Sequence, residues 1–138
     1  MPSAIHKASY AYVEIPNKPG ELARMLESLR EANVNLLAFS GFPQGRGKAQ
    51  LDLVTDDVDG LKAVAKRRKW KLSRTKRCFL VQGADELGAA VPPVSTVAGA
   101  RINVLAAYAI AAGDGRFGML FWVEPRDYNR AAKQLGAV

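Results

Sequence analysis

The chain has 138 residues, a length that fits one ordinary domain or two very small ones. Hydrophobic residues make up 49% of it and charged residues 24%, which indicates a globular chain and excludes an intrinsically disordered one. The formal net charge is +7, and eight basic residues lie within the twelve positions 66–77. Such a segment can bind nucleic acid or an acidic partner. We favour another interpretation, in which these residues form a solvated helix end and an edge strand whose charges prevent pairing with other chains.

Other classes of protein are excluded by what the sequence lacks. No apolar run reaches the roughly 18 residues that a membrane-spanning helix needs, so we expect no membrane partner. Residues 1–7 lack the apolar core of a signal peptide, which favours a cytoplasmic location. Cys78 is the only cysteine, which excludes an internal disulfide and a cysteine-based metal site. No catalytic set of residues stands out, so we expect no enzyme, no metal and no cofactor.

An internal repeat with an offset of 68 residues organises the chain. The two copies align without a gap. The identical pairs are Gly20 and Gly88, Ala32 and Ala100, Asn35 and Asn103, Ala38 and Ala106, Gly45 and Gly113, Gly47 and Gly115, Asp59 and Asp127, and Ala63 and Ala131. We therefore predict two domains, at residues 1–76 and 77–138.

The first copy predicts the element order βαββαβ. Its strand patterns cover residues 10–15, 34–42, 48–54 and 70–76, and its helix patterns cover residues 20–32 and 59–68. Apolar and polar side chains alternate along residues 48–54, which is typical of a half-buried strand. This order is ferredoxin-like and belongs to the α+β class with antiparallel sheets.

The second copy predicts the same order without a last strand. Its strands are expected at residues 78–82, 102–111 and 116–123, with a helix within 93–98 and another over 125–135. Pro92 and Pro93 fall where the first helix of the other copy is in its second turn, so this helix should start late or be broken. An unpaired sheet edge would be a hazard. We expect residues 3–9, the other copy or a second chain to fill it.

The connection between the first strand and the first helix is the best candidate site. It reads Ile15-Pro16-Asn17-Lys18-Pro19-Gly20-Glu21-Leu22-Ala23. Proline and glycine favour a tight turn, and Leu22, Met25, Leu26 and Leu29 have helical spacing. The first amides of a helix lack partners and lie at the positive end of its dipole, so this turn suits a carboxylate. Asn17 and Asn35 could add amide groups there, or could serve only as local turn and cap residues.

The run from Val13 to Ala23, followed by residues 32–36, resembles the ACT domain, an amino-acid-binding regulatory module. Nearly the whole chain is similar to small stand-alone proteins with two ACT domains in tandem. The resemblance implies a non-enzymatic sensor or regulatory protein, a free amino acid bound at an interface between domains or subunits, a homodimer, and allosteric control of a partner enzyme. The ligand-binding residues it implies are Asn17, Lys18, Pro19, Gly20, Glu21, Leu22, Asn35 and Leu36, with Asp85, Gly88 and Asn103 in the second copy.

The second copy departs from this pattern at its turn. Leu87 replaces the turn proline and Asp85 replaces the asparagine, which disfavours a ligand carboxylate but could receive an ammonium group. We therefore expect the first site to be the better one. The apolar residues Ile15, Leu36 and Leu37 would admit an aliphatic ligand side chain.

Two other functions stay open from the sequence. The chain could be a protein-interaction module without a small ligand, acting through basic residues 71–77. It could also bind RNA, because RNA-recognition motifs share the βαββαβ order and place aromatic residues on one strand. Phe117, Met119 and Phe121 share a strand face, but a sheet buried under helices needs the same pattern, so nucleic acid is the less favoured partner.

Overall fold

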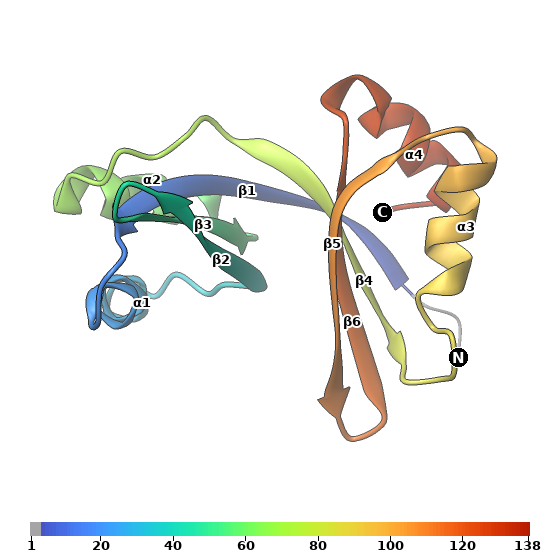
Figure 1. Cartoon of the computed structure of the whole chain (residues 1–138), viewed down its shortest axis with the longest axis horizontal. Coiled ribbons are helices and arrows are strands. Elements are labelled where there is room, and N and C mark those ends of the chain that lie inside the picture. The colour runs from blue at the N-terminus through green and yellow to red at the C-terminus, as the bar shows by residue number, and fades with distance from the viewer. Residues whose placement is uncertain (1–3) are drawn as a thin grey trace. The chain divides into compact units, whose positions relative to one another are not determined.

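The computed structural model describes residues 4–138, which form two compact units (Figure 1). The N-terminal unit is Ser9–Lys76, and the C-terminal unit combines Arg77–Val138 with the residues up to Ala8. The elements are β1 (Ala4–Pro16), α1 (Glu21–Glu31), β2 (Ala38–Gly45), β3 (Lys48–Thr55), α2 (Val58–Arg68), β4 (Lys76–Ala84), α3 (Val91–Gly99), β5 (Val104–Gly113), β6 (Arg116–Val123), the short 3-10 helix η1 (Pro125–Asp127) and α4 (Tyr128–Leu135). The predicted α+β, ferredoxin-like class is confirmed. The division into domains at 1–76 and 77–138 stays a prediction.

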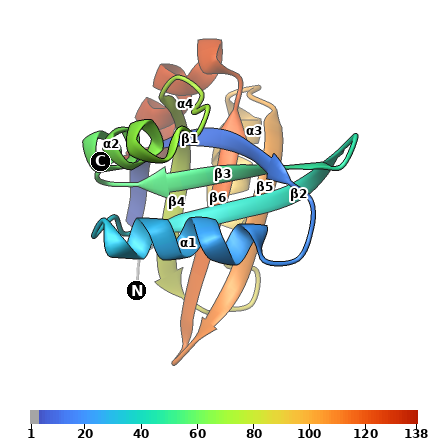
Figure 2. The same cartoon turned by 90° about the vertical axis from the view of Figure 1, so that its left-hand side faces the viewer.

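The N-terminal unit places its strands in the order β2-β3-β1, and both pairings are antiparallel. Its two helices share one apolar core with the sheet. Figure 2 shows this unit from the side of α1. Met25 and Leu29 of α1 and Leu61 of α2 pack on Leu51 and Leu53 of β3. The alternation predicted along residues 48–54 therefore directs its apolar side chains into this core.

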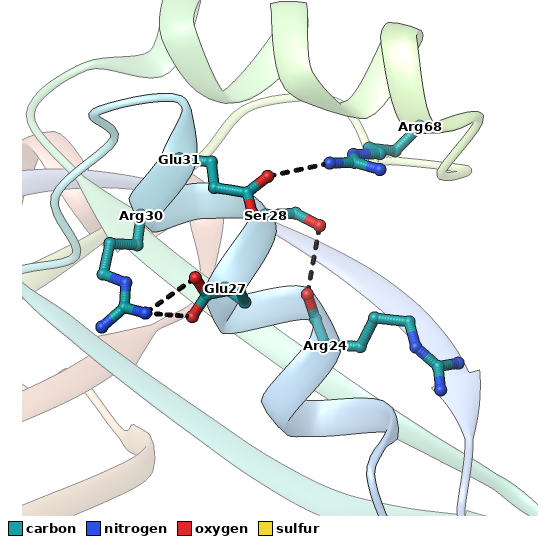
Figure 3. A network of polar contacts seen from close by, with 6 residues as sticks. All are labelled: Arg24, Glu27, Ser28, Arg30, Glu31 and Arg68. Atoms are coloured by element: carbon teal, nitrogen blue, oxygen red, sulfur yellow. Dashed lines mark hydrogen bonds and ion pairs between the residues drawn. The ribbon is translucent and has the colours of Figure 1, made fainter.

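Polar contacts on the helices of the N-terminal unit are mostly exposed. Arg68 of α2 approaches Glu31 of α1 with 3.2 Å between Nη2 and Oε2, and Arg30 lies 2.6 Å from Glu27 within α1 (Figure 3). Exposed ion pairs contribute about 1 kcal/mol or less. The apolar core is thus the main reason that the two helices stay on the sheet.

The predicted fourth strand of the first copy, residues 70–76, does not form a regular strand. Ser73 forms the hydrogen bonds of this segment to β1: its amide donates to the Tyr12 carbonyl at 2.9 Å, and its hydroxyl oxygen accepts from the Tyr12 amide at 2.8 Å. A serine hydroxyl that accepts a hydrogen bond from a strand amide replaces the main-chain carbonyl that a neighbouring strand would supply. It therefore competes with the regular hydrogen bonds between strands. The strand prediction is wrong here because a side chain satisfies the edge of β1.

The C-terminal unit places its strands in the order β1-β4-β6-β5, and β6 pairs antiparallel with β4 and β5. Its core is rich in aromatic residues. The ring of Tyr128 in α4 stacks on Phe79 of β4 with 4.4 Å between centroids, and its hydroxyl donates to the Cys78 carbonyl at 2.8 Å. Burial raises the pKa of Tyr128 to about 12.

The open edge of the second copy is filled by the start of the chain. Residues 4–8 of β1 group with the C-terminal unit, where β1 lies next to β4. On the other side of β1, Val138 donates to the Ile5 carbonyl at 3.0 Å and accepts from the Lys7 amide at 2.8 Å. Of the three predicted ways to fill this edge, the N-terminal residues are the one observed; Ser3 lies outside the described residues.

The first helix of the second copy starts late, as predicted. It begins at Val91, whereas the equivalent of Glu21 would be Ala89. Pro92 and Pro93 occupy its first turn, where a missing amide hydrogen removes no helical hydrogen bond. The prolines thus set the start of α3 and leave the rest of the helix intact.

The repeat also appears in the backbone. Gly20 and Gly88 have φ angles of 90° and 71°, and Asn33 and Arg101 have φ angles of 58° and 60°. The predicted strands at residues 34–42 and 102–111 begin late, at Ala38 and Val104. Asn35 and Asn103 therefore precede their strands instead of lying within them.

Candidate functional site

The turn between β1 and α1 is held by main-chain hydrogen bonds. The Lys18 amide donates to Pro16 at 3.0 Å and the Glu21 amide to Lys18 at 3.4 Å, while the Asn17 amide donates to Gly47 at 2.8 Å. The last bond ties the turn to the hairpin between β2 and β3. Gly20 precedes the helix with a φ of 90°, a conformation that glycine adopts without strain.

The start of α1 leaves amide donors available. Its first helical bond runs from the Arg24 amide to the Gly20 carbonyl at 3.0 Å. The amides of Leu22 and Ala23 come before this bond and find no acceptor within residues 4–138. No side chain caps the helix, and the Glu21 carboxylate is held 3.2 Å from Arg24 Nη1. The helix start therefore keeps donors for an external acceptor.

A pocket of about 210 Å³ lies beside this turn. It is lined by Ile15, Pro16, Asn17, Lys18, Leu22, Gly41, Phe42, Pro43, Ala49 and Leu51. Pockets for drug-sized ligands measure roughly 300–1,000 Å³, so this size suits a small metabolite. Lys18 is the charged residue of the lining and Asn17 adds an amide. The pocket can therefore offer a cation and an amide to a small anionic group, and an apolar wall to the rest of a ligand.

Strand register explains why the pocket exists. Ala49 of β3 lies between Ile15 of β1 and Pro43 of β2, so a small side chain separates two larger ones. Next to it, Gly41 pairs with Leu51, and a Cβ on Gly41 would come within 2.8 Å of Leu51 Cδ2. The small residues at positions 41 and 49 therefore keep the space above the sheet open.

The C-terminal unit has the same turn, but different side chains lie on the sheet beside it. The Asp85 amide donates to Gly115 at 2.9 Å, as the Asn17 amide does to Gly47. At the position of Ala49, however, stands Phe117, which lies between Gly83 and Ala111 and belongs to the buried core. A large aromatic side chain therefore lies on the sheet where the N-terminal unit has a small one. A pocket of about 390 Å³ still lies beside this turn, but Glu86 and Gly88 line it together with residues of α3 and α4.

The structure brings together only part of the predicted site. Asn17, Lys18 and Leu22 line the 210 Å³ pocket, while Pro19, Gly20 and Glu21 form the turn beside it. Gly88 lines the 390 Å³ pocket, and Asp85 and Asn103 line neither of the two. The strand residues Gly41, Phe42, Pro43 and Ala49 were not among the predicted site residues.

Asn35 and Leu36 lie at the other end of the N-terminal unit. The Asn35 carbonyl accepts from Thr55 Oγ1 at 2.8 Å, and Thr55 ends β3, whereas Lys48 begins β3 opposite Pro16. Seven residues of a strand span about 23 Å. Asn17 and Asn35 of the same unit therefore do not meet.

The features behind the alternative functions have structural roles. Phe117, Met119 and Phe121 are part of the C-terminal core and do not form an exposed stacking surface. In the basic segment, the Arg77 guanidinium lies 4.0 Å above the Tyr128 ring, and Arg68 pairs with Glu31. Within residues 4–138, no helix is long and apolar enough to cross a membrane, and no group of three metal-ligating side chains gathers.

Comparison with known proteins yields similarity in structure alone, since no family model and no curated protein sequence matches the chain. Protein BT0572 from Bacteroides thetaiotaomicron superposes with a TM-score of 0.74 at 16% identity, over 94% of this chain and 89% of that one. The aspartokinase alpha and beta subunits give 0.63 at 14% identity, over 98% and 95%. The regulatory subunit of aspartate kinase from Thermus thermophilus gives 0.61 at 15%, over 97% and 94%. These similarities show a shared fold.

Proposed function

We propose that this chain is a non-enzymatic regulatory protein, built from two ACT-like units in tandem, that binds a free amino acid in the N-terminal unit. The observation that carries the proposal is the 210 Å³ pocket at the start of α1, where available amides and Lys18 lie beside an apolar wall. A fold shared with a regulatory subunit of aspartate kinase supports a regulatory role over a catalytic one.

The pocket provides for each part of a small zwitterion. Lys18 and the amides at the start of α1 receive the carboxylate, since cations and helix N-termini both attract anions. The side-chain oxygen of Asn17 accepts from the ammonium group. Ile15, Leu22 and Leu51 surround an aliphatic side chain, and the limited volume disfavours larger ligands.

The second asparagine comes from another unit in this proposal. Asn35 lies about 23 Å from the turn of its own unit, by strand length. It reaches a ligand only across an interface between units or subunits, and Asn103 is its counterpart in the second copy. The protein accordingly acts as a homodimer in which the ligand stabilises one assembly, and that shift is passed to a partner enzyme.

A thermal-shift panel of the twenty amino acids tests the proposal. A ligand present at 100 times its dissociation constant adds roughly 2.7 kcal/mol to the free energy of unfolding, so a binding amino acid raises the Tm by several degrees. Aliphatic amino acids should give the largest shift. Ala49→Phe adds a ring between Ile15 and Pro43 at the wall of this pocket, so the variant should lose the shift; its own Tm without ligand shows whether it folds.

The matched control is Ala63→Phe, which adds the same ring at an exposed position of α2. Its shift should equal that of the unchanged protein. The proposal fails if no amino acid shifts the Tm, or if Ala49→Phe keeps the full shift. In the first case an interaction module without a small ligand becomes the better interpretation, and a pull-down with a salt titration follows.

A further inference from the structure

The positive charge of this chain is concentrated in one short stretch. Residues 66–77 contain eight of the 20 lysine and arginine residues and none of the 13 acidic residues. The rest of the chain has 12 basic and 13 acidic residues, so it is close to neutral. The whole excess of positive charge therefore comes from this stretch, and all of it except Arg77 belongs to the N-terminal unit.

Five cations of the stretch are exposed and have no ion-pair partner within residues 4–138. Arg68 differs from them because it pairs with Glu31 (Figure 3), and Lys76 differs because its Nζ lies 5.6 Å from the centre of the Tyr12 ring. The five cations, which we call the basic surface, are Lys66, Arg67, Lys69, Lys71 and Arg74. Their charge is available to an external partner.

The end of helix α2 does not require this many cations. Cations stabilise the last turn of a helix through its dipole. The last turn of α2 has three of them, Lys66, Arg67 and Arg68, whereas the last turns of α1 and α4 have one each. Lys69 ends α2 with a φ of 61°, a conformation for which α4 uses Gly136. A side chain costs about 1 kcal/mol there relative to glycine, so helix stability does not account for this charge.

The backbone that presents these cations is held in place. The Trp70 amide donates to the Ala65 carbonyl at 2.8 Å, and Ser73 forms two hydrogen bonds with Tyr12 of β1. The side chains of Trp70 and Leu72 pack against the core of the N-terminal unit. The apolar side chains of the stretch therefore point inward, and the cations remain at the surface. A fixed backbone lowers the entropy that a partner must overcome on binding.

These features favour the phosphate backbone of nucleic acid over an acidic protein. Protein interfaces obtain most of their affinity from buried aromatic and apolar residues, but Trp70 and Leu72 already pack in their own unit. Binding to a phosphate backbone needs only cations. A membrane surface fits less well for the same reason, because stable attachment needs an inserted apolar group or an acyl chain beside the basic residues.

We propose that the basic surface binds the phosphate backbone of double-stranded nucleic acid without reading its sequence. The stretch from Lys69 to Arg74 spans at most about 18 Å. A duplex has one negative charge per 1.7 Å or so of its axis, which gives about ten phosphates over this length, so each cation can meet one. This activity goes beyond the proposed ligand pocket, since none of the five cations lines it.

Fluorescence anisotropy of the whole chain with a labelled DNA duplex of about 20 base pairs tests the proposal. Each phosphate contact releases about 0.9 counterions, so the plot of log affinity against log salt concentration should have a slope of up to about −4.5. A duplex of another sequence should bind equally well. The combined substitutions Lys69→Gln, Lys71→Gln and Arg74→Gln should reduce the slope by about 2.7 and weaken binding at low salt at least tenfold.

The matched control removes three other exposed cations that have no ion-pair partner within the described part of the chain. It combines Arg46→Gln, Arg116→Gln and Lys133→Gln. Both triple variants lower the net charge by three, so the control separates a local surface from the charge of the whole protein. Its affinity and its salt dependence should stay close to those of the unchanged protein.

Acetylation of lysines in the unchanged protein gives a second test, which does not depend on the folding of any variant. Bound duplex should slow the modification of Lys66, Lys69 and Lys71, because their ammonium groups contact phosphates. It should leave Lys48 and Lys133 unaffected. Mass spectrometry of the peptides measures the protection at each position.

Four results would overturn the proposal: no binding at low salt, equal losses in the two triple variants, no protection of the three lysines, or tighter binding to another polyanion. Tighter binding to poly-glutamate would assign the surface to an acidic protein, and tighter binding to phosphatidylserine vesicles would assign it to a membrane. A response to an amino acid without duplex binding overturns the basic surface alone. Duplex binding without any such response overturns the ligand proposal alone.

Discussion

The two units of this chain have similar backbones but differ in the side chains that their strands place beside the turn. Both have a left-handed glycine before the first helix and the same amide bond from the turn to the hairpin, 2.8 Å long in one and 2.9 Å in the other. In the N-terminal unit, small Ala49 lies between Ile15 and Pro43. In the C-terminal unit, large Phe117 lies between Gly83 and Ala111. A pocket lies beside the turn in both units, but strands β1, β2 and β3 line the one of about 210 Å³ in the N-terminal unit, whereas α3 and α4 line much of the one of about 390 Å³ in the C-terminal unit.

The difference teaches that the turn alone does not make a site. The glycine and the turn are present twice, yet the free amides are not, because α3 begins with Val91, whose amide donates to Gly88, and with the prolines Pro92 and Pro93. A binding function on this fold therefore depends on side chains of neighbouring strands, which can change while the backbone stays the same. Three sets of measurements, from the largest expected effect to the smallest, test the comparison.

Phe117→Ala should have the largest effect on stability. Removing a buried phenylalanine typically lowers the free energy of unfolding by about 3–5 kcal/mol, because the cavity persists after the ring is lost. Phe117 is 8% exposed and packs in the aromatic core. Denaturant unfolding measures the loss, and Phe39→Ala, at a phenylalanine that is 44% exposed, should lose far less. A loss below 1 kcal/mol for Phe117→Ala would show that its ring does not fill the unit.

Alkaline pH should weaken the C-terminal unit through Tyr128. Its pKa is raised to about 12 by burial, while an unfolded tyrosine titrates near 10. Below pH 10 neither state ionises and the stabilisation is complete. Between pH 10 and 12 only the unfolded state ionises, so the free energy of unfolding falls by about 2–3 kcal/mol. The N-terminal unit has Gly60 at this position and should lack the effect.

Tyr128→Phe provides the control for this titration. It removes the hydroxyl that donates to Cys78 and should cost about 1 kcal/mol at neutral pH. The difference in unfolding free energy between wild type and variant, followed from pH 8 to 12 by chemical denaturation, should shrink above pH 10 and then change sign, because the loss from ionisation exceeds the gain from the hydrogen bond. A difference that stays constant over this range would contradict the assigned pKa.

Gly20→Ala and Gly88→Ala should have the smallest effects on stability and the most informative contrast. Both glycines have positive φ, and an added Cβ meets nothing within 4 Å at Gly20 and only Val91 Cγ2 at 3.5 Å at Gly88. Each variant should lose about 1 kcal/mol through backbone strain alone. Amino-acid binding should weaken in Gly20→Ala and stay unchanged in Gly88→Ala. Equal weakening in both, measured by calorimetry, would place a ligand in each unit.

The fold could be predicted from the sequence because the same local patterns occur in both copies. The glycines of the turns, the helical spacing after Leu22 and the alternation along residues 48–54 all predicted elements that the structure contains. The late start of α3 followed from Pro92 and Pro93. The expected strand at residues 70–76 failed because one hydroxyl, that of Ser73, replaced a strand pairing. Periodicity gives no signal for such a replacement.

The pocket was beyond the reach of sequence patterns for a different reason. Its wall combines β1, β2 and β3, and the register between these strands decides that Ala49 faces Pro43. A one-residue shift would send every side chain to the other face. The turn residues Asn17 and Lys18 could be predicted because they are contiguous with the helix start. The alignment of the two copies did indicate the strand residues of the pocket. In it the small residue Ala49 corresponds to the large residue Phe117, and Gly41 corresponds to Ala109.

The pairing of Val138 with the segment around Ile5 has a consequence for how the chain folds as it leaves the ribosome. The two residues are 133 positions apart, so this contact forms only after Val138 has been synthesised, and contacts of such high order slow folding. Ser9–Lys76 can close on itself long before that point. The N-terminal unit can therefore assemble first, and residues 4–8 complete their contacts only after Val138 has emerged.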